Sequence, residues 1–453
     1  MSAKTCFSLA AACLWVGGLN CAGASGLDGI KTVFIILMEN HDWSTIEGSP
    51  NCPYINTHLL PKASHARQYY NPPGLHPSEP NYLWLEAGTS FGILNDNPPS
   101  VNHLKSTNHL VTLLNKAGIS WKAYEEDITG TYPPLTNAYP YAVRHNPFVY
   151  FDDVANNIAY CTNHVRPYRE LAGDLLNNAV ARYNFITPNL TNDMHQLDPN
   201  TPAITSTRIL GDQWLSREIP KLLASQAYND DGAIFITWDE GANDVSDGPI
   251  GMIVLSPHAK GGGYTNSIHY THSSTLRTMQ NIFGVRPYLG DAVKPTDLRD
   301  LFVNLTLTAA ATQTSNQFQF RLAGLIPGKQ TVIQSSTDLW SWNSISTNVP
   351  LTDTMTFRDD WATDSNPRFY RAIQLADVFV KFALTSPERS PLGQFRFTLT
   401  GVTPGRTNVI EASTNLLNWT AISTNVVATN RITFTDSGAT NHDRRHYRAF
   451  QLP

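Results

Sequence analysis

Four short, nearly continuous apolar runs constrain the fold of this chain more than any other feature. They are Lys31–Met38, Arg182–Thr187, Ala233–Trp238 and Gly251–Leu255. Runs of this kind are typical of strands buried on both faces, as in a parallel sheet covered by helices. Helical patterns lie between and around them, at 79–88, 107–117, 166–180, 205–226 and 272–283. This alternation predicts an α/β domain over residues 25–308.

The sequence after Leu307 repeats itself. Phe318–Gly324 matches Phe395–Gly401. Further pairs keep the same offset without a gap: Pro327-Gly328 with Pro404-Gly405, Ser336-Thr337 with Ser413-Thr414, Trp342 with Trp419, Thr347-Asn348 with Thr424-Asn425, and Tyr370-Arg371 with Tyr447-Arg448. Alternation with period two, broken by Pro-Gly and Asn-rich turns, predicts one small β-sandwich per repeat, at 309–375 and 376–453.

Length and composition bound the class of protein. A chain of 453 residues is too long for one ordinary core, so several domains are expected. Hydrophobic residues make up 41% and charged residues 15%, which indicates a globular protein and not a disordered one. The net charge of -5, with no long basic run, argues against nucleic acid or an anionic membrane as the partner.

The first residues have the pattern of an export signal. Lys4 precedes an apolar stretch from Phe7 to Val16, and Ala22-Gly23-Ala24 fits a small-x-small cleavage site. We therefore predict a signal peptide over residues 1–24 and a secreted or periplasmic protein; a buried N-terminal helix is the alternative. The apolar stretch is too short for a stable membrane anchor, and no later segment reaches transmembrane length.

Two cysteines remain outside the predicted signal peptide. They are Cys52 and Cys161, an even number in a protein predicted to reach an oxidising compartment. A single disulfide between them is the expectation, and two buried free thiols are the alternative.

Two acidic pairs follow predicted strands. Glu39-Asn40 comes directly after the strand at 32–38, and Asp239-Glu240 follows the strand at 233–238. Ligands in open α/β sheets gather at the carboxyl ends of the strands. Oxygen ligands that converge there would hold a divalent cation, although acidic residues after strands also cap helices and turns.

Histidines add to this pattern. His195 lies just past a predicted strand, and His269 and His272 open a predicted helix. Histidine can bind a metal or contact a phosphoryl oxygen or a leaving group. A single histidine is more often an ordinary surface or core residue, so these three remain suggestive on residue type alone.

Ser78 stands where a predicted helix begins, with Pro80 in the first turn. One interpretation is an N-cap serine. The other is a nucleophile, because free N–H groups at a helix N-terminus suit a phosphoryl group attached to the hydroxyl. A neighbouring cation would lower the pKa of that hydroxyl.

Five ordered segments carry a resemblance to a known family. They are MENHDWSTI, HPSEPNYLWLEAG, FITPNLTNDMH, FITWDEG and HYTHSSTLRTMQNIFG, and the resemblance covers residues 32 to about 290. In this order they resemble the phosphoesterase family of acid phosphatases and bacterial phospholipases C. The resemblance implies an alkaline-phosphatase-like three-layer fold with a mostly parallel sheet; it does not extend to the repeats.

The resemblance also implies roles for individual residues. The expected divalent-metal ligands, for one or two ions, are Glu39, Asn40, Ser78, Asp239 and Glu240. Ser78 is the expected nucleophile, Asn81 the expected phosphoryl-binding residue, and His195 and His272 contact the phosphate or assist the leaving group. His76 and Asp193 are expected to contact these residues and orient them, without binding the metal or the phosphate themselves.

One departure bears on substrate class. The phospholipase branch carries a Gly-Gly and an Asp-His after its Asp-Glu, whereas this chain has Asp239-Glu-Gly-Ala-Asn-Asp-Val-Ser-Asp247. This difference favours a phosphomonoesterase of the acid phosphatase type, acting on a phosphorylated small molecule or lipid. A phospholipase C for phosphocholine-type lipids is the alternative. A binding or adhesion protein with an inactive α/β domain is the alternative from another class, in which the repeats bind a surface or polysaccharide.

Overall fold

A computed structural model describes residues 12–15 and 26–451. The description omits 202, 243–245, 304, 310–317, 327–328, 339–340, 360–368, 375–382, 391–392, 401, 403–404, 406, 415–419, 430 and 443. Most of the predicted signal peptide therefore lies outside the described residues. The part that is described, β1 (Ala12–Trp15), pairs antiparallel with a strand of the first repeat.

The α/β part of the chain is built on an eight-stranded sheet. In spatial order its strands are β10 (Tyr264–Asn266), β3 (Ser64–Ala66), β9 (Met252–Leu255), β8 (Gly232–Trp238), β2 (Thr32–Met38), β7 (Tyr183–Thr187), β5 (Trp121–Glu125) and β6 (Val165–Pro167). The five strands from β8 to β6 run parallel, whereas β9 is antiparallel to both of its neighbours. Nearly every residue of β2, β7 and β8 is buried, as expected for central strands covered on both faces.

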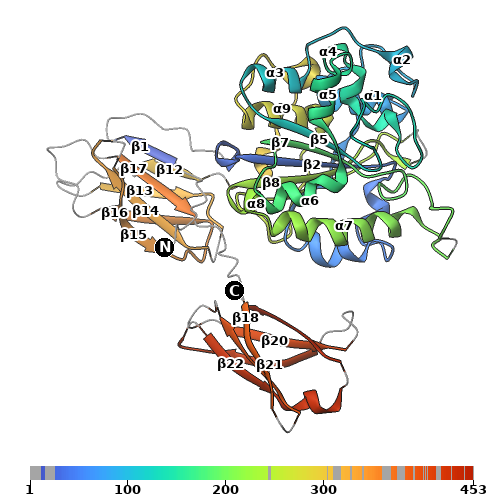
Figure 1. Cartoon of the computed structure of the whole chain (residues 1–453). Coiled ribbons are helices and arrows are strands. Elements are labelled where there is room, and N and C mark those ends of the chain that lie inside the picture. The colour runs from blue at the N-terminus through green and yellow to red at the C-terminus, as the bar shows by residue number, and fades with distance from the viewer. Residues whose placement is uncertain are drawn as a thin grey trace. The chain divides into compact units, whose positions relative to one another are not determined.

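Helices cover both faces of this sheet (Figure 1). They are α1 (Ser78–Ala87), α2 (Pro99–Asn102), α3 (Leu110–Lys116), α4 (Asp152–Ala155), α5 (Ile158–His164), α6 (Leu171–Leu176), α7 (Thr207–Leu223), α8 (Gln226–Asn229) and α9 (His272–Ile282). A separate two-stranded ladder joins β4 (Tyr69–Tyr70) to β11 (Tyr270–Thr271). The predicted α/β class with a mostly parallel sheet is confirmed. The single helix predicted at 166–180 is instead the strand β6, a 3-10 turn and the short α6.

The repeats have matching six-stranded folds. The first contains β12 (Thr306–Ala309), β13 (Phe318–Ala323), β14 (Thr331–Ser336), β15 (Asn343–Asn348), β16 (Thr354–Asp359) and β17 (Phe369–Gln374). The second contains β18 (Ala383–Arg389), β19 (Phe395–Thr400), β20 (Thr407–Ser413), β21 (Thr420–Val426), β22 (Arg431–Asp436) and β23 (His446–Gln451). Each has two antiparallel sheets, ordered β12-β13-β16 with β17-β14-β15, and β18-β19-β22 with β23-β20-β21. This confirms the predicted all-β repeats.

The same buried pair lies in both repeats. The Tyr370 hydroxyl donates to Asp359 Oδ2 at 2.9 Å, and the Tyr447 hydroxyl donates to Asp436 Oδ2 at 2.8 Å. The chain divides into two compact units at Ala376, with the second repeat forming the second unit.

The core of the first repeat begins before residue 308. Val303, Leu305 and Leu307 pack in one cluster with Phe320 and Tyr370, whereas Phe302 belongs to the core of the α/β part. The backbone of Val303 still bonds to the α/β part, since its carbonyl accepts from Gly26 N–H and its N–H donates to the His258 carbonyl. The α/β part therefore ends close to Val303.

A chain ending at Val303 should fold and keep the phosphoesterase activity that the motifs predict, at the rate of the full chain. It keeps the backbone bonds of Val303, and it leaves no strand of the first repeat behind. A chain ending at Leu307 should be less soluble, because it exposes Leu305 and Leu307 without their partners. Turnover of p-nitrophenyl phosphate and melting temperature measure both effects. A folded Val303-ended chain without turnover would show that the repeats contribute to the site.

The predicted disulfide is absent: Cys52 and Cys161 are both free and buried. Cys52 lies before a π-helical turn near Asp212 of α7, whereas Cys161 lies in α5, which packs on β5 and β6. The two thiols thus occupy different apolar environments. Burial raises the pKa of each to about 12, so neither is a reactive thiolate.

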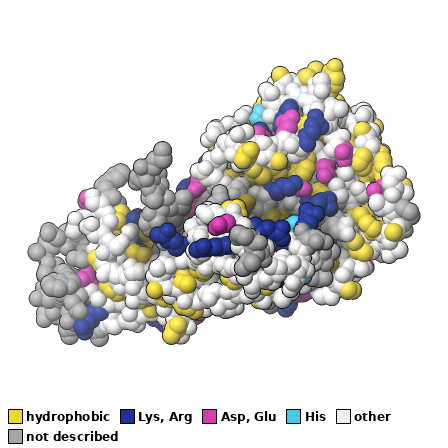
Figure 2. All heavy atoms as spheres, turned by 60° about the horizontal axis from the view of Figure 1, so that its bottom comes forward, with side chains coloured by type: hydrophobic (Ala, Val, Ile, Leu, Met, Phe, Trp, Pro, Cys, Tyr) yellow, Lys and Arg dark blue, Asp and Glu magenta, His cyan; other side chains and the backbone are white. Residues whose placement is uncertain are grey.

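Hydrophobic and charged side chains are mixed on one face of the molecule. On the face drawn in Figure 2, hydrophobic side chains are scattered among charged and uncharged polar ones. Among the described residues, no helix combines the length and apolar character needed to cross a membrane.

Candidate active site

Strand register brings the two predicted acidic pairs together. In the parallel ladder of β2 and β8, Met38 pairs with Trp238, so Glu39 and Asp239 follow at adjacent positions. Both carboxylates are completely buried. The backbone N–H of Asn40 donates to Asp239 Oδ1 at 3.0 Å. Asn40 has a φ of 42°, in the left-handed region that asparagine tolerates better than most residues, and this turn ends the strand.

Ser78 lies beside these carboxylates and is not an N-cap. The N-cap of α1 is Pro77, and Ser78 is the first helical residue. Its hydroxyl donates to Glu39 Oε2 at 3.1 Å. Only 2% of Ser78 is exposed. The hydroxyl therefore points toward the acidic pair and not back to the helix backbone.

A third carboxylate and a histidine complete the cluster. Asp193 is fully buried, and its Oδ2 lies 3.4 Å from His145 Nδ1; His145 Nε2 lies 3.3 Å from Glu39 Oε1. The ring of His145 stacks on Tyr82 with centroids 5.1 Å apart, and the Tyr82 hydroxyl donates to Glu39 Oε1 at 2.5 Å. Glu39 is thus shared between Ser78 on one side and Tyr82 and His145 on the other.

Burial and mutual repulsion disfavour the charged forms of these acids. Burial raises the pKa of Glu39 well above its usual range, and the charges of Asp239 and Asp193 raise it further. Burial likewise raises the pKa of Asp193 well above its usual range, and that of Asp239 to about 6. Burial lowers the pKa of His145 well below its usual range, with Arg144 acting in the same direction. The imidazole is therefore neutral at pH 7, which is the form that binds metals.

These residues fit a divalent cation. Asp193 Oδ2 and Asp239 Oδ2 are buried and make no hydrogen bond. Glu39, His145 and Asp193 each offer a ligand atom, and these atoms lie within 4.8 Å of one another, the only such group among the described residues. Hard oxygen donors with one imidazole suit a small divalent ion, which would also stabilise the ionised carboxylates.

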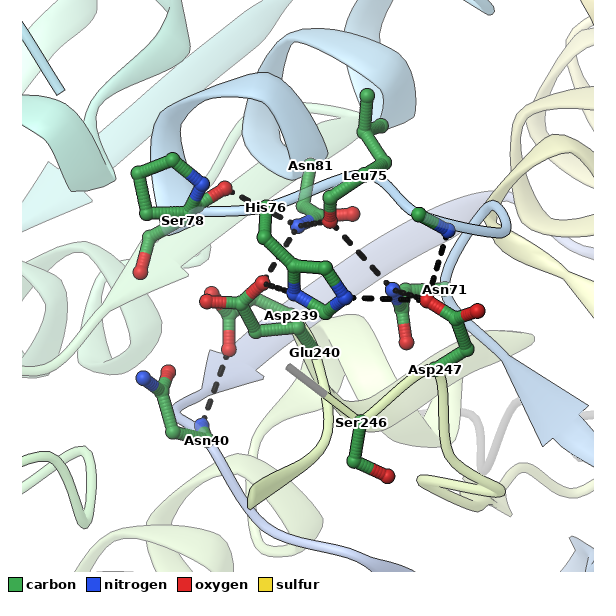
Figure 3. A network of polar contacts seen from close by, with 12 residues as sticks. Asn40, Asn71, Leu75, His76, Ser78, Asn81, Asp239, Glu240, Ser246 and Asp247 are labelled. Carbon is green, nitrogen blue, oxygen red and sulfur yellow. Dashed lines mark hydrogen bonds and ion pairs between the residues drawn. The ribbon is translucent and has the colours of Figure 1, made fainter. Parts of the chain in front are cut away.

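Glu240 faces a different set of partners (Figure 3). Its Oε2 forms a short contact with His76 Nδ1 and accepts from Asn81 Nδ2 at 3.2 Å. The other ring nitrogen of His76 lies 3.0 Å from Asp247 Oδ1, which also accepts from the Gly74 backbone at 2.8 Å. Glu240 therefore holds the turn that precedes α1, beside Asp239.

Asn81 and His272 are engaged within the protein. Asn81 is fully buried, and its Nδ2 donates to the Leu75 carbonyl at 2.8 Å as well as to Glu240. His272 is also fully buried; its Nδ1 lies 3.1 Å from the Tyr69 hydroxyl and its Nε2 bonds to the Asp239 carbonyl. Burial lowers the pKa of His272 to about 4. In this geometry both residues hold other site residues in place. His269 is exposed and stacks on Tyr70.

His195 lies at the accessible side of the cluster. Its backbone N–H donates to Asp193 Oδ1 at 2.7 Å, and its Nε2 accepts from Arg144 Nη2 at 3.2 Å. Arg144 also lies 3.3 Å from Asp96 through its Nε.

Sequence patterns gave no signal for two residues of this site. Arg144 and His145 come from a 3-10 turn, Val143–His145, inside a long irregular segment without a motif. Two features of that segment, a basic pair and its position between predicted elements, are too common to single it out.

Comparisons with known proteins find similar phosphatases and one similar solved structure. The chain is 29% identical to a phosphatidylinositol-3-phosphatase of Mycobacterium tuberculosis over 64% of this chain and 89% of that protein. It is 30% identical to a phosphate-repressible acid phosphatase of Penicillium chrysogenum over 48% of this chain, and so spans about half (51%) of that relative. A solved structure of an alkaline phosphatase superfamily protein from Vibrio parahaemolyticus covers 72% of this chain and 86% of that chain, at 14% identity and a TM-score of 0.40.

The family assignment follows from a match to the Phosphoesterase family over residues 65–286, the segment that contains Ser78, His145, Asp193 and Asp239. The resemblance predicted from the five motifs is confirmed over this range. Residues 65–286 belong to the Phosphoesterase family, and the chain is a phosphoric ester hydrolase.

Proposed function

We propose that this enzyme is an exported, metal-dependent phosphomonoesterase that transfers the phosphoryl group to Ser78. The observation that carries the proposal is the orientation of the Ser78 hydroxyl, which is buried, does not cap its helix and bonds to Glu39. Export is supported by the signal-like composition of residues 1–24.

The metal belongs to this proposal. Glu39, Asn40, Ser78 and Asp239 would hold it, with Asp193 and His145 on the far side of Glu39 and Glu240 as the remaining predicted ligand. A bound divalent cation lowers the pKa of the serine hydroxyl and neutralises charge on the transferring group. The buried, unbonded Oδ2 of Asp239 supports this assignment.

The remaining steps rest on residues of the chain itself. Ser78 attacks phosphorus and loses its hydroxyl proton, and the P–O bond to the leaving group breaks. The leaving oxygen gains a proton and departs as the alcohol, which leaves a phosphoserine. His195, half-buried beside Asp193, is placed to hydrogen-bond the leaving oxygen, and water then hydrolyses the phosphoserine to release phosphate. His272 and Glu240 keep Asp239 and the turn before Ser78 in position.

The relatives support a monoester substrate. A phosphatase removes a phosphate group from a monoester, whether the alcohol is a small molecule or an inositol lipid, whereas a phospholipase C cleaves a diester. Two relatives, an acid phosphatase and a phosphatidylinositol-3-phosphatase, are both named as phosphatases. The missing Gly-Gly and Asp-His after Asp239-Glu240 point the same way.

Aryl phosphate monoesters should therefore be hydrolysed faster than phosphatidylcholine. The measurement is release of p-nitrophenol and phosphate from p-nitrophenyl phosphate, compared with release of phosphocholine from mixed micelles under the same metal supply. Hydrolysis of phosphatidylcholine without monoesterase activity would assign the enzyme to the phospholipase C type.

A further inference from the structure

Arg144 connects the two sides of the candidate active site. Its Nη2 donates to His195 Nε2 at 3.2 Å, and His195 in turn bonds through its backbone to Asp193. Its Nε lies 3.3 Å from Asp96 Oδ2. Asp96 Oδ1 accepts from the backbone N–H of Glu79, the residue that follows Ser78, at 3.0 Å. The guanidinium therefore lies between the nucleophile helix and His195.

Arg144 is also partly accessible, as His195 is. Its side chain is 18% exposed, whereas Glu39, Asp193 and His145 are at most 1% exposed. Among the contacts of the described residues, Nη1 has no hydrogen-bond partner, so one arm of the guanidinium is left for a ligand. Two of its arms are fixed by Asp96 and His195, which orients the plane of the group.

The charge of the site calls for such a group. Glu39, Asp193 and Asp239 carry three negative charges when ionised, and one divalent cation leaves an excess of one. A phosphate monoester arrives as a dianion, so it meets repulsion unless a further cation faces it. Arg144 is close enough for its charge to act on Glu39, Asp193 and His145.

We propose that Arg144 binds the non-bridging phosphoryl oxygens and that this contact makes the enzyme selective for monoesters over diesters. The inference rests on the proposed phosphomonoesterase function and names the residue that determines its substrate class. A monoester dianion presents enough charged oxygens for both the metal and the guanidinium. A diester has one negative charge and a second ester group at the position that Arg144 reaches, so it gains less from the same cation.

The test is the ratio of two activities in Arg144→Ala and Arg144→Lys. We expect Arg144→Ala to lower kcat/KM for p-nitrophenyl phosphate about 100-fold, in the range seen when one transition-state donor is removed. We expect kcat/KM for bis(p-nitrophenyl) phosphate to fall less than about 5-fold, because its single charge depends less on the guanidinium. The kcat/KM of Arg144→Lys for p-nitrophenyl phosphate should lie between those of wild type and Arg144→Ala. Lysine keeps the positive charge but lacks the planar, bidentate donors of the guanidinium. The inhibition constant of inorganic phosphate should rise about 10-fold or more in Arg144→Ala.

Arg166→Ala is the matched control. Arg166 is 24% exposed and ion-paired with Glu170, so its loss removes a comparable charge outside the site and should leave both activities unchanged. Equal losses on both substrates, an unchanged inhibition constant for phosphate, or a loss of bound metal in Arg144→Lys would overturn the inference. A wild-type enzyme without monoesterase activity would instead overturn the proposed function, which keeps the two failures distinct.

Discussion

Ser78→Ala should abolish nearly all phosphomonoester hydrolysis, by about 10,000-fold or more, with little change in melting temperature. The hydroxyl is the proposed nucleophile, and no other described side chain occupies its position between α1 and Glu39. Its loss removes one hydrogen bond to a carboxylate that keeps Tyr82 as a donor. Metal should remain bound, because Glu39, Asn40 and Asp239 stay in place.

Ser225→Ala provides the control, because Ser225 does what Ser78 does not. Its hydroxyl oxygen caps α8 by accepting from the Tyr228 N–H at 3.2 Å. Ser225 is buried and is not one of the residues of the candidate active site. We expect this variant to lose about 1 kcal/mol of stability and to keep full turnover. One variant thus changes the rate and the other the free energy of unfolding.

Trapping gives the covalent step a direct measurement. A slow phosphate ester, quenched in acid, should leave a phosphoryl group on the peptide that contains Ser78, and mass spectrometry would locate it. Near-normal turnover in Ser78→Ala would make water the nucleophile and would reject the phosphoserine.

Removing the metal should lower turnover roughly 1,000-fold, equivalent to about 4 kcal/mol of transition-state stabilisation. Activity should return when a divalent cation is added back to the chelated protein. Metal analysis of the purified enzyme and dialysis against a chelator make the measurement. Full activity in protein that contains far less than one metal ion per chain would contradict the proposed role of the metal.

Stability gives an independent readout of the same site. In the metal-free protein, burial raises the pKa of Asp239 to about 6, against about 4 in the unfolded chain, and the pKa values of Glu39 and Asp193 are also raised. Between these two pKa values the folded state holds protons that the unfolded chain has released. The free energy of unfolding of the metal-free protein is therefore undiminished by these acids below about pH 4 and falls as the pH rises through about 6. The decrease is on the order of 3 kcal/mol for Asp239 alone.

A bound cation should cancel that loss, because it favours the ionised carboxylates. We expect the difference in melting temperature between metal-loaded and chelated protein to grow from pH 4 to pH 7. Buried His272, with a pKa lowered to about 4, favours unfolding as the pH falls. It does so in both forms, so it drops out of the difference. A difference that stays constant across this pH range would show that the metal is held elsewhere.

The sequence by itself determined the parts of this protein that depend on local pattern. Continuous apolar runs indicated the central strands, and the acids that follow β2 and β8 meet because parallel neighbours end at the same edge of a sheet. The constant offset between Phe318–Gly324 and Phe395–Gly401 indicated two equivalent β folds, because a repeated sequence pattern encodes a repeated set of strand pairings.

Only the tertiary structure decided which side chains from irregular segments reach those acids. Arg144 and His145 lie in a turn whose position is set by packing against Tyr82 and by bonds to Asp96 and His195, residues far away along the chain. No local periodicity encodes such contacts. The same holds for Cys52 and Cys161, which are both free. Their even number suggested a bond, but a disulfide requires two Cα atoms within about 7 Å, and that distance depends on tertiary packing.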